Sequence, residues 1–68
     1  MDKLNQFELM ASALGHDATE SQQAFLLDWM LDELRKDEWC VAQDIAICHG
    51  LKSLSADISM HMGESGWV

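Results

Sequence analysis

Two cysteines and three histidines are the residues of this sequence most typical of a zinc site. A zinc site needs four ligands, and most of them come in closely spaced pairs. Cys48 and His49 are adjacent, but neighbours on a helix point about 100° apart and do not converge on one ion. The remaining candidate ligands, Cys40, His16 and His61, form no closely spaced pair. We therefore expect no metal site.

Catalysis by side chains alone is the second chemistry to consider. A nucleophilic Cys needs a His beside it that a third group orients, whereas Cys48 and His49 are adjacent only in sequence. Paired carboxylates occur as Asp28 with Asp32 and as Asp37 with Glu38. A chain of 68 residues has little material for the dry pocket that would raise a carboxylate pKa. We expect no enzymatic activity and no cofactor.

The two cysteines also bear on the compartment. An eight-residue separation places Cys40 and Cys48 about 12 Å apart on a straight helix, beyond the roughly 7 Å that a disulfide spans. We expect half-buried, reduced thiols, although an intermolecular bridge stays open. The first residues resemble no signal peptide, and no run of about 20 apolar residues occurs. We expect a cytoplasmic protein that does not bind membranes.

The charge balance argues against direct nucleic-acid binding. Twelve acidic and four basic residues give a formal net charge of −8, which repels phosphate backbones. Ala46 and Gly50 have the spacing of the alanine and turn glycine in helix-turn-helix DNA readers. The segment that would read the bases, residues 53–61, contains no Arg or Lys. We expect no direct contact with nucleic acid.

Helices must position all of these residues, because the chain has no proline and its glycines lie between apolar-periodic segments. The first helix is predicted over residues 3–14, with Asp2 as its N-cap and Gly15 as its C-terminal stop. The second is predicted over 19–36, because Thr19 and Gln22 match a capping box, with Asp17 and Glu20 as a competing box. Its apolar stripe consists of Ala24, Leu26, Leu27, Met30, Leu31 and Leu34.

A third helix is predicted over residues 38–62. Gly50 lies in its middle, where glycine costs about 1 kcal/mol relative to alanine. One continuous helix and two shorter helices hinged near Gly50 both fit the pattern. We favour the continuous helix, because the apolar stripe keeps its phase across the glycine. The stripe consists of Cys40, Ile47, Leu51, Leu54, Ile58 and Met62.

These elements predict an all-α fold, either a small antiparallel helical hairpin or a three-helix unit. Residues 1–62 form the single domain, and the glycine-rich residues 63–68 form a flexible tail whose Trp67 either folds back or docks on a partner. A domain this short buries about 60% of the surface that its unfolded chain exposes. Since 49% of the residues are apolar, we expect a homodimer to cover the surplus.

Two aromatic residues of the second helix do not follow its apolar stripe. Phe25 and Trp29 lie one turn apart beside the polar arc and form a second apolar ridge. Either another helix of the same chain packs on this ridge, or a partner or second copy does. Aromatic residues dominate binding hot spots, which argues for a partner, and both alternatives stay open.

The function predicted from these patterns is a non-enzymatic protein interaction module, such as a small regulator or inhibitor. Its partner is a protein with a basic or apolar groove. The predicted aromatic anchors are Phe25, Trp29 and Trp39. An acidic rim steers the partner more than it adds affinity, and it consists of Asp28, Asp32, Glu33, Asp37 and Glu38.

Two other functions stay open. Asp28 and Asp32 are about 6 Å apart along one helix face, near the phosphate separation of a nucleic-acid strand, so the chain could mimic a nucleic acid and block a DNA- or RNA-binding protein. It could also be a purely structural homo-oligomer or co-chaperone. A mimic should lose affinity steeply with salt, and sedimentation should identify a homo-oligomer.

Overall fold

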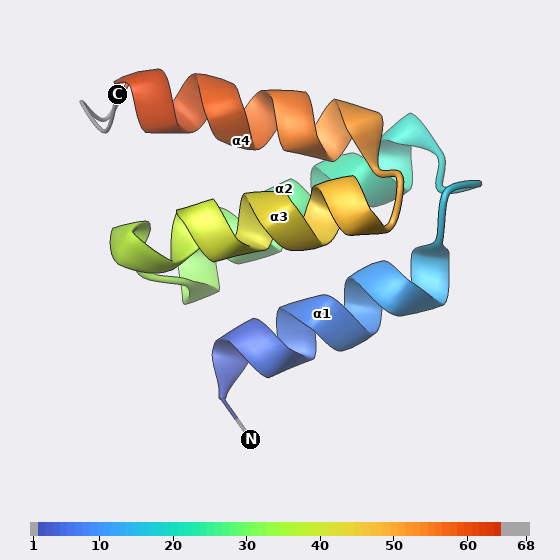
Figure 1. The fold of residues 1–68 in the computed structure, drawn as a ribbon, viewed down its shortest axis with the longest axis horizontal. Helices are drawn as coiled ribbons and strands as arrows, with labels where there is room; N and C mark the ends of the chain where they lie inside the picture. Colours follow the sequence, from blue (N-terminus) through green and yellow to red (C-terminus); the bar gives the residue numbers. More distant parts are fainter. Residues whose placement is uncertain (1, 65–68) are drawn as a thin grey trace.

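Four α-helices make up most of the chain in the computed structural model, which describes residues 2–64 (Figure 1). They are α1 (Lys3–Leu14), α2 (Glu20–Glu33), α3 (Trp39–Cys48) and α4 (Lys52–Glu64), with a short 3₁₀ turn, η1 (Lys36–Glu38), between α2 and α3. The described residues contain no strand, so the predicted all-α class is confirmed. The expected hairpin or three-helix unit is instead a four-helix unit.

The first two helices begin where the capping residues predict. The carboxylate of Asp2 accepts a hydrogen bond from the backbone N–H of Asn5 at 2.7 Å. Thr19 and Gln22 make both hydrogen bonds of a capping box, at 3.2 and 2.9 Å. Gly15 ends α1 with a φ of +69°, and its N–H donates to the carbonyl of Ala11.

The second helix ends three residues earlier than the predicted residue 36. Leu34 takes an extended conformation, with φ −94° and ψ 149°, and its side chain is buried in the core. A new turn starts directly afterwards, because the side chain of Glu38 accepts a hydrogen bond from the backbone N–H of Arg35 at 3.1 Å. This turn redirects the chain into α3.

The predicted continuous helix over residues 38–62 is wrong, and the alternative of two helices hinged near Gly50 is what the structure has. Gly50 adopts a φ of +73°, in the left-handed region that favours glycine. The N–H of Leu51 donates to the carbonyl of Ala46 and that of Gly50 to Ile47, at 2.9 and 3.1 Å. This is a Schellman motif, and it ends α3. The stripe keeps its phase because both helices face one core.

The predicted tail also begins too early, because residues 63 and 64 are the last residues of α4. Residues 65–68, which include Trp67, lie outside the described residues, so the alternatives for Trp67 stay predictions.

The helices pack around one hydrophobic core. Helices α3 and α4 form the most extensive contact, α2 packs on α4, and α1 packs on both α2 and α3 (Figure 1). The core consists of Phe7, Ala11, Leu26, Met30, Leu34, Trp39, Ala42, Ala46, Leu51, Leu54, Ile58 and Met62. Three predicted core positions, Ala24 in α2 and Cys40 and Ile47 in α3, are exposed instead. Trp39, Ala42 and Ala46 face the core from α3 in place of Cys40 and Ile47.

One buried polar side chain joins α2 to α4. Gln23 donates a hydrogen bond from Nε2 to the carbonyl of Ala18 at 3.0 Å, and its Oε1 accepts one from the backbone N–H of Leu54 at 2.9 Å. The first N–H groups of a helix have no partner within the helix. Gln23 therefore satisfies one of these groups in α4 from a neighbouring helix.

Candidate functional site

The exposed side of α2 is where predicted anchors and predicted acids come together. Helix α2 buries Gln23, Leu26 and Met30, so at 100° per residue Phe25 and the acids that follow it point away from the core. Phe25 is 63% exposed. A shallow depression of about 450 Å³ lies beside it, and its lining is Phe25, Asp28, Trp29, Leu31 and Asp32. We call these residues the α2 face.

Trp29 has both of the roles that the sequence left open. It is half-buried, and its ring stacks on the buried ring of Phe7 in α1, with centroids 6.4 Å apart and an interplanar angle of 25°. The same residue lines the depression on the α2 face. The two aromatic residues of the ridge therefore differ, because Trp29 packs on α1 while Phe25 is exposed to solvent.

Trp39 is not available as a surface anchor. It is only 6% exposed and lies in the core at the start of α3. Its ring lies nearly perpendicular to that of His61 in α4, at 78° with centroids 6.5 Å apart, and its indole N–H has no acceptor among residues 2–64. The turn η1 places Trp39 on the same side of α3 as Ala42, which faces the core. A partner could reach this ring only if the core opened.

Glu33, one of the predicted rim acids, lies within an intrachain ion pair. Its carboxylate is 2.9 Å from the Nζ of Lys3. This contact ties the end of α2 to the start of α1, which sequence spacing does not reveal. The carboxylate is half-buried and is therefore only partly available to a partner.

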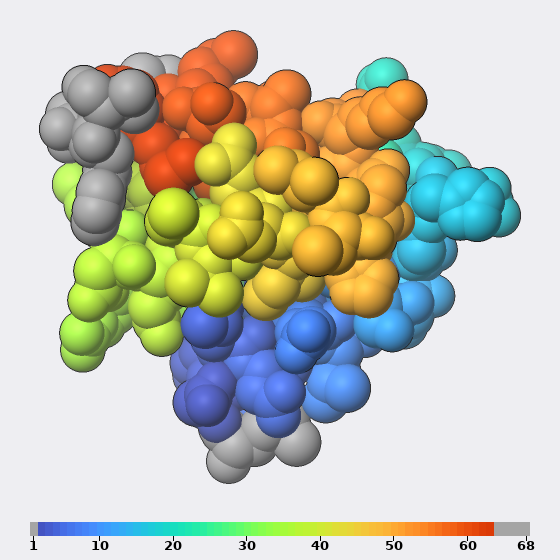
Figure 2. All heavy atoms as spheres, in the orientation of Figure 1, coloured from blue at the N-terminus to red at the C-terminus, as the bar shows by residue number. Residues whose placement is uncertain are grey.

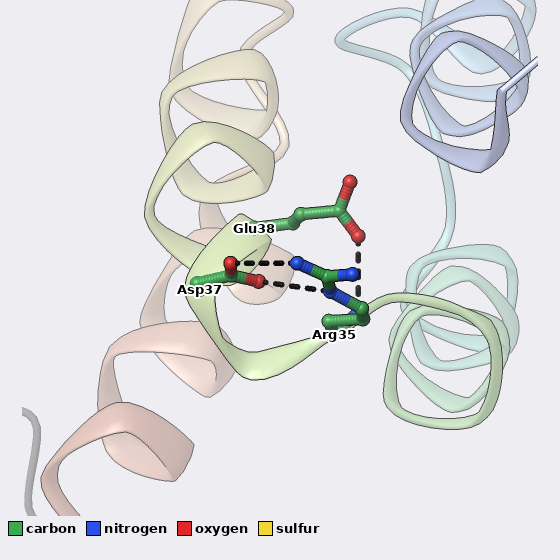
Figure 3. A network of polar contacts seen from close by, with 3 residues as sticks. All are labelled: Arg35, Asp37 and Glu38. Atoms are coloured by element: carbon green, nitrogen blue, oxygen red, sulfur yellow. Dashed lines mark hydrogen bonds and ion pairs between the residues drawn. The ribbon is translucent and has the colours of Figure 1, made fainter.

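Asp37 and Glu38 belong to the turn between α2 and α3 (Figure 3). The guanidinium of Arg35 donates two hydrogen bonds to Asp37, at 3.1 and 3.4 Å, while Glu38 holds the backbone N–H of Arg35. The hydrogen bond from Arg35 lowers the pKa of Asp37 below its ordinary value, because it favours the charged carboxylate. Both acids help to shape the turn, and the structure does not place them on the α2 face.

Asp28 and Asp32 are the acids that remain on the α2 face. Both are exposed, and neither forms an ion pair with any residue of the described range 2–64. They lie three and seven residues after Phe25, which places them on the same side of the helix. The face therefore combines one open aromatic ring with two uncompensated negative charges.

The structure also describes the remaining predicted ligands and the membrane-spanning potential of the helices. No three His, Cys, Asp or Glu side chains of residues 2–64 come together as a metal-binding group. Cys40 and Cys48 are exposed rather than half-buried as predicted. None of the described helices has the length and apolar composition needed to cross a membrane.

The α2 face contains residues from the predicted site and one that the prediction assigned elsewhere. Leu31 was expected in the core stripe, but it is half-buried and also lines the depression. Its position at the edge of the apolar arc is the signal that could have placed it there. The chain matches no protein-family model, no curated protein and no solved structure with which it was compared.

Proposed function

We propose that this chain is a protein-binding module whose α2 face docks on a partner that carries cationic groups around an apolar surface. The exposed ring of Phe25 is the observation that supports this function most directly. Fully burying such a side chain contributes about 1.5–3 kcal/mol, and aromatic residues are frequent binding hot spots. The module would act by occupying its partner's surface, as a small regulator or inhibitor does.

The charges of the α2 face favour a cationic partner. Asp28 and Asp32 line the same depression as Phe25, and the formal net charge of the chain is −8. A field of this sign attracts Lys and Arg side chains during encounter and orients them, which raises the association rate more than the final affinity. Phe25 would then supply the contact that slows dissociation.

Nucleic-acid mimicry has weaker support. A mimic needs an array of carboxylates spaced like phosphates. On the α2 face only Asp28 and Asp32 could serve, because Glu33 is paired with Lys3 and Asp37 with Arg35. A phenylalanine ring beside the two aspartates has no counterpart in a phosphate backbone. A protein partner therefore accounts for more of the face.

Affinity capture from the native host's lysate tests the proposal with three forms of the protein: wild type, Phe25→Ala and Leu9→Ala. Leu9 is the matched control, because it is another exposed large apolar residue but lies on α1. Phe25→Ala is preferable to Trp29→Ala, because Trp29 also packs on Phe7 and its loss would disturb the fold. The partner should be retained by wild type and by Leu9→Ala and be lost with Phe25→Ala.

Measurements with the captured partner then separate the contributions. Phe25→Ala should weaken binding by about 10- to 100-fold, as expected from the burial of one aromatic ring. Asp28→Asn with Asp32→Asn should mainly slow association, and the wild-type affinity should fall only modestly with salt. The proposal would be refuted if Phe25→Ala left the affinity unchanged, or if Leu9→Ala weakened it equally. A steep loss of wild-type affinity with salt would favour the mimic.

A further inference from the structure

Two further depressions continue the α2 face along α2 and onto α4. The first, of about 440 Å³, shares Phe25, Asp28 and Leu31 with the α2 face. The second, of about 570 Å³, shares Ser21 and Ala24 with the first. We call the three linked depressions the extended α2 face. In addition to Ser21 and Ala24, it adds to the α2 face Glu20, Leu27, Ser53, Ala56 and Asp57.

The extended α2 face includes a groove between two helices. Its second depression is lined from both α2 and α4, which pack on each other. Helix α2 lies behind α3 in Figure 1, so Figure 2, in the same orientation, shows mainly side chains of α1, α3 and α4. The exposed alanines Ala24 and Ala56 line the groove from its two sides. Such small side chains allow another helix to approach closely.

Acidic residues lie at both ends of the extended α2 face, and none of its lining residues is basic. Glu20 and Asp57 line one end, and Asp28 and Asp32 line the other. None of these four carboxylates forms an ion pair within residues 2–64. The groove between α3 and α4 differs, because Lys52 is its only charged lining residue. The extended α2 face therefore attracts cations at two separate places.

The spacing of these acids indicates the size of the partner element. From residue 20 to residue 32, a rise of about 1.5 Å per residue separates the two ends by about 18 Å. Phe25 and Leu27 lie between the ends along α2. A partner helix of about 12 residues covers the same distance. Complementarity then requires cationic side chains near both of its ends and an apolar stripe between them.

A helix fits this surface better than an extended peptide. An extended peptide gains main-chain hydrogen bonds by adding to an open strand edge, and residues 2–64 contain no strand. An amphipathic helix satisfies its own main-chain groups and binds through side chains at helical spacing in an apolar groove. The groove between α2 and α4 is of this kind.

We infer that the partner docks an amphipathic helix on the extended α2 face, with Lys or Arg side chains near both of its ends and an apolar stripe between them. The inference rests on the proposed function, because it assigns the partner element that the same site binds. Cations at one end of the helix pair with Asp28 and Asp32, and those at the other end pair with Glu20 and Asp57. The apolar stripe covers Phe25.

Three synthetic peptides of equal length, about 16 residues, test this inference by fluorescence anisotropy at low salt. The first is an amphipathic helix with a leucine stripe and lysines at both ends. The second has the same composition, but its lysines lie together at the centre. The third is the first peptide with a central proline, which breaks the helix. The wild-type chain should bind the first peptide at least about fivefold more tightly than the other two.

Matched charge variants locate the contact. Glu20→Gln with Asp57→Asn should raise the Kd for the first peptide by about three- to tenfold. Glu8→Gln with Asp44→Asn is the control, because it removes the same charges from exposed positions of α1 and α3, and it should change the Kd by less than about twofold. Far-UV circular dichroism should show the wild-type helical content for both variants, since none of the four side chains is buried. Phe25→Ala should raise the Kd by about 10- to 100-fold.

The outcomes separate this inference from the proposed function. If the two charge variants had the same Kd while Phe25→Ala still weakened binding, the inference would be wrong and the proposed function would stand. The same holds if the proline peptide bound as tightly as the first peptide. Failure of the first peptide to bind at about millimolar concentration would overturn the inference alone, because the capture experiment tests the function without it. Peptide binding that did not depend on Phe25 would count against both.

Sedimentation of the purified chain tests the other occupant of this face. The wild type with the first peptide bound should have the mass of one chain and one peptide. A wild type that dimerises, and that no longer binds the peptide as a dimer, would assign the extended α2 face to a second copy and overturn the inference.

Discussion

Gln23 offers the sharpest test of how this fold is held together. Its side chain is buried between α2 and α4, where Oε1 accepts from the backbone N–H of Leu54 and Nε2 donates to the carbonyl of Ala18. Gln23→Met keeps the length of the side chain and removes both hydrogen-bonding groups. The N–H of Leu54 then stays buried without an acceptor, because α4 itself offers none so close to its start.

The expected cost follows from that orphaned group. Leaving a buried donor unsatisfied destabilises a protein by about 1–3 kcal/mol, while the apolar methionine side chain recovers little of it. For a domain of this size the loss corresponds to a drop in Tm of about 5–20 °C. Gln6→Met is the matched control, because Gln6 is half-buried on α1 and its side chain makes no hydrogen bond within residues 2–64. It should change stability by less than about 0.5 kcal/mol.

Two measurements check this prediction. Urea unfolding followed by circular dichroism gives the free energy of unfolding for wild type, Gln23→Met and Gln6→Met. Amide hydrogen exchange then locates the effect, because the N–H of Leu54 should lose more protection than the neighbouring N–H groups of α4. If Gln23→Met were as stable as Gln6→Met, or if Leu54 kept its protection, the bridge between α2 and α4 would not stabilise the fold.

The remaining predictions concern one glycine, one ion pair and one core ring. Gly50→Ala should destabilise the fold by about 1–2 kcal/mol in urea unfolding, because alanine disfavours a φ of +73°. Gly63→Ala, in open space within α4, should instead stabilise the fold by about 0.5–1 kcal/mol. Equal effects of the two variants would contradict the turn geometry. The lowered pKa of Asp37 means that its pair with Arg35 stabilises the fold above the ordinary Asp pKa and ceases to do so as the pH falls through the lowered value. Carboxyl NMR should show this titration, with Arg35→Gln restoring an ordinary midpoint. Trp39→Ala should lower the free energy of unfolding by about 3–5 kcal/mol through the cavity it leaves. Trp39→Phe removes an indole N–H that has no acceptor in the described residues, and it should lower that free energy by less than about 2 kcal/mol. Similar losses for the two variants would show that the packing of the ring does not stabilise the fold.

Local signals in the sequence predicted the starts of the first two helices well. Asp2 and Thr19 act through hydrogen bonds to residues three places away, so the chain's own order contains the information. Gly15 also ends α1 through a local contact, the hydrogen bond from its N–H to the carbonyl of Ala11. Where a single residue and its near neighbours decide the geometry, sequence spacing was sufficient.

The break at Gly50 could not be decided by periodicity. A Schellman turn reverses the chain within a few residues, yet Ala46 before it and Leu51 after it both face the core. An apolar stripe can therefore run on unchanged through a change of helix direction. The left-handed conformation of Gly50 was the deciding feature, and a sequence shows only that glycine permits it.

The candidate site also contains one feature that the sequence predicts and one that it does not. The exposure of Phe25 follows from its angular distance from Leu26 and Met30 on one helix, which the sequence contains. The burial of Trp39 depends instead on where η1 ends and α3 begins, and a shift of one position moves a side chain by about 100°. The predicted stripe therefore passes through Cys40 instead of Trp39, and the alanines that face the core of α3 are too small to stand out as core positions.

Some of the predicted acids form ion pairs within the chain and others do not, and helical periodicity does not reveal which. Glu33 meets Lys3 only because α1 packs against α2, and the two residues are far apart in sequence. The acids left uncompensated on the α2 face are then Asp28 and Asp32, beside Phe25. Of the five acids that the sequence offers as a rim, the cationic partner that we propose would therefore meet only these two.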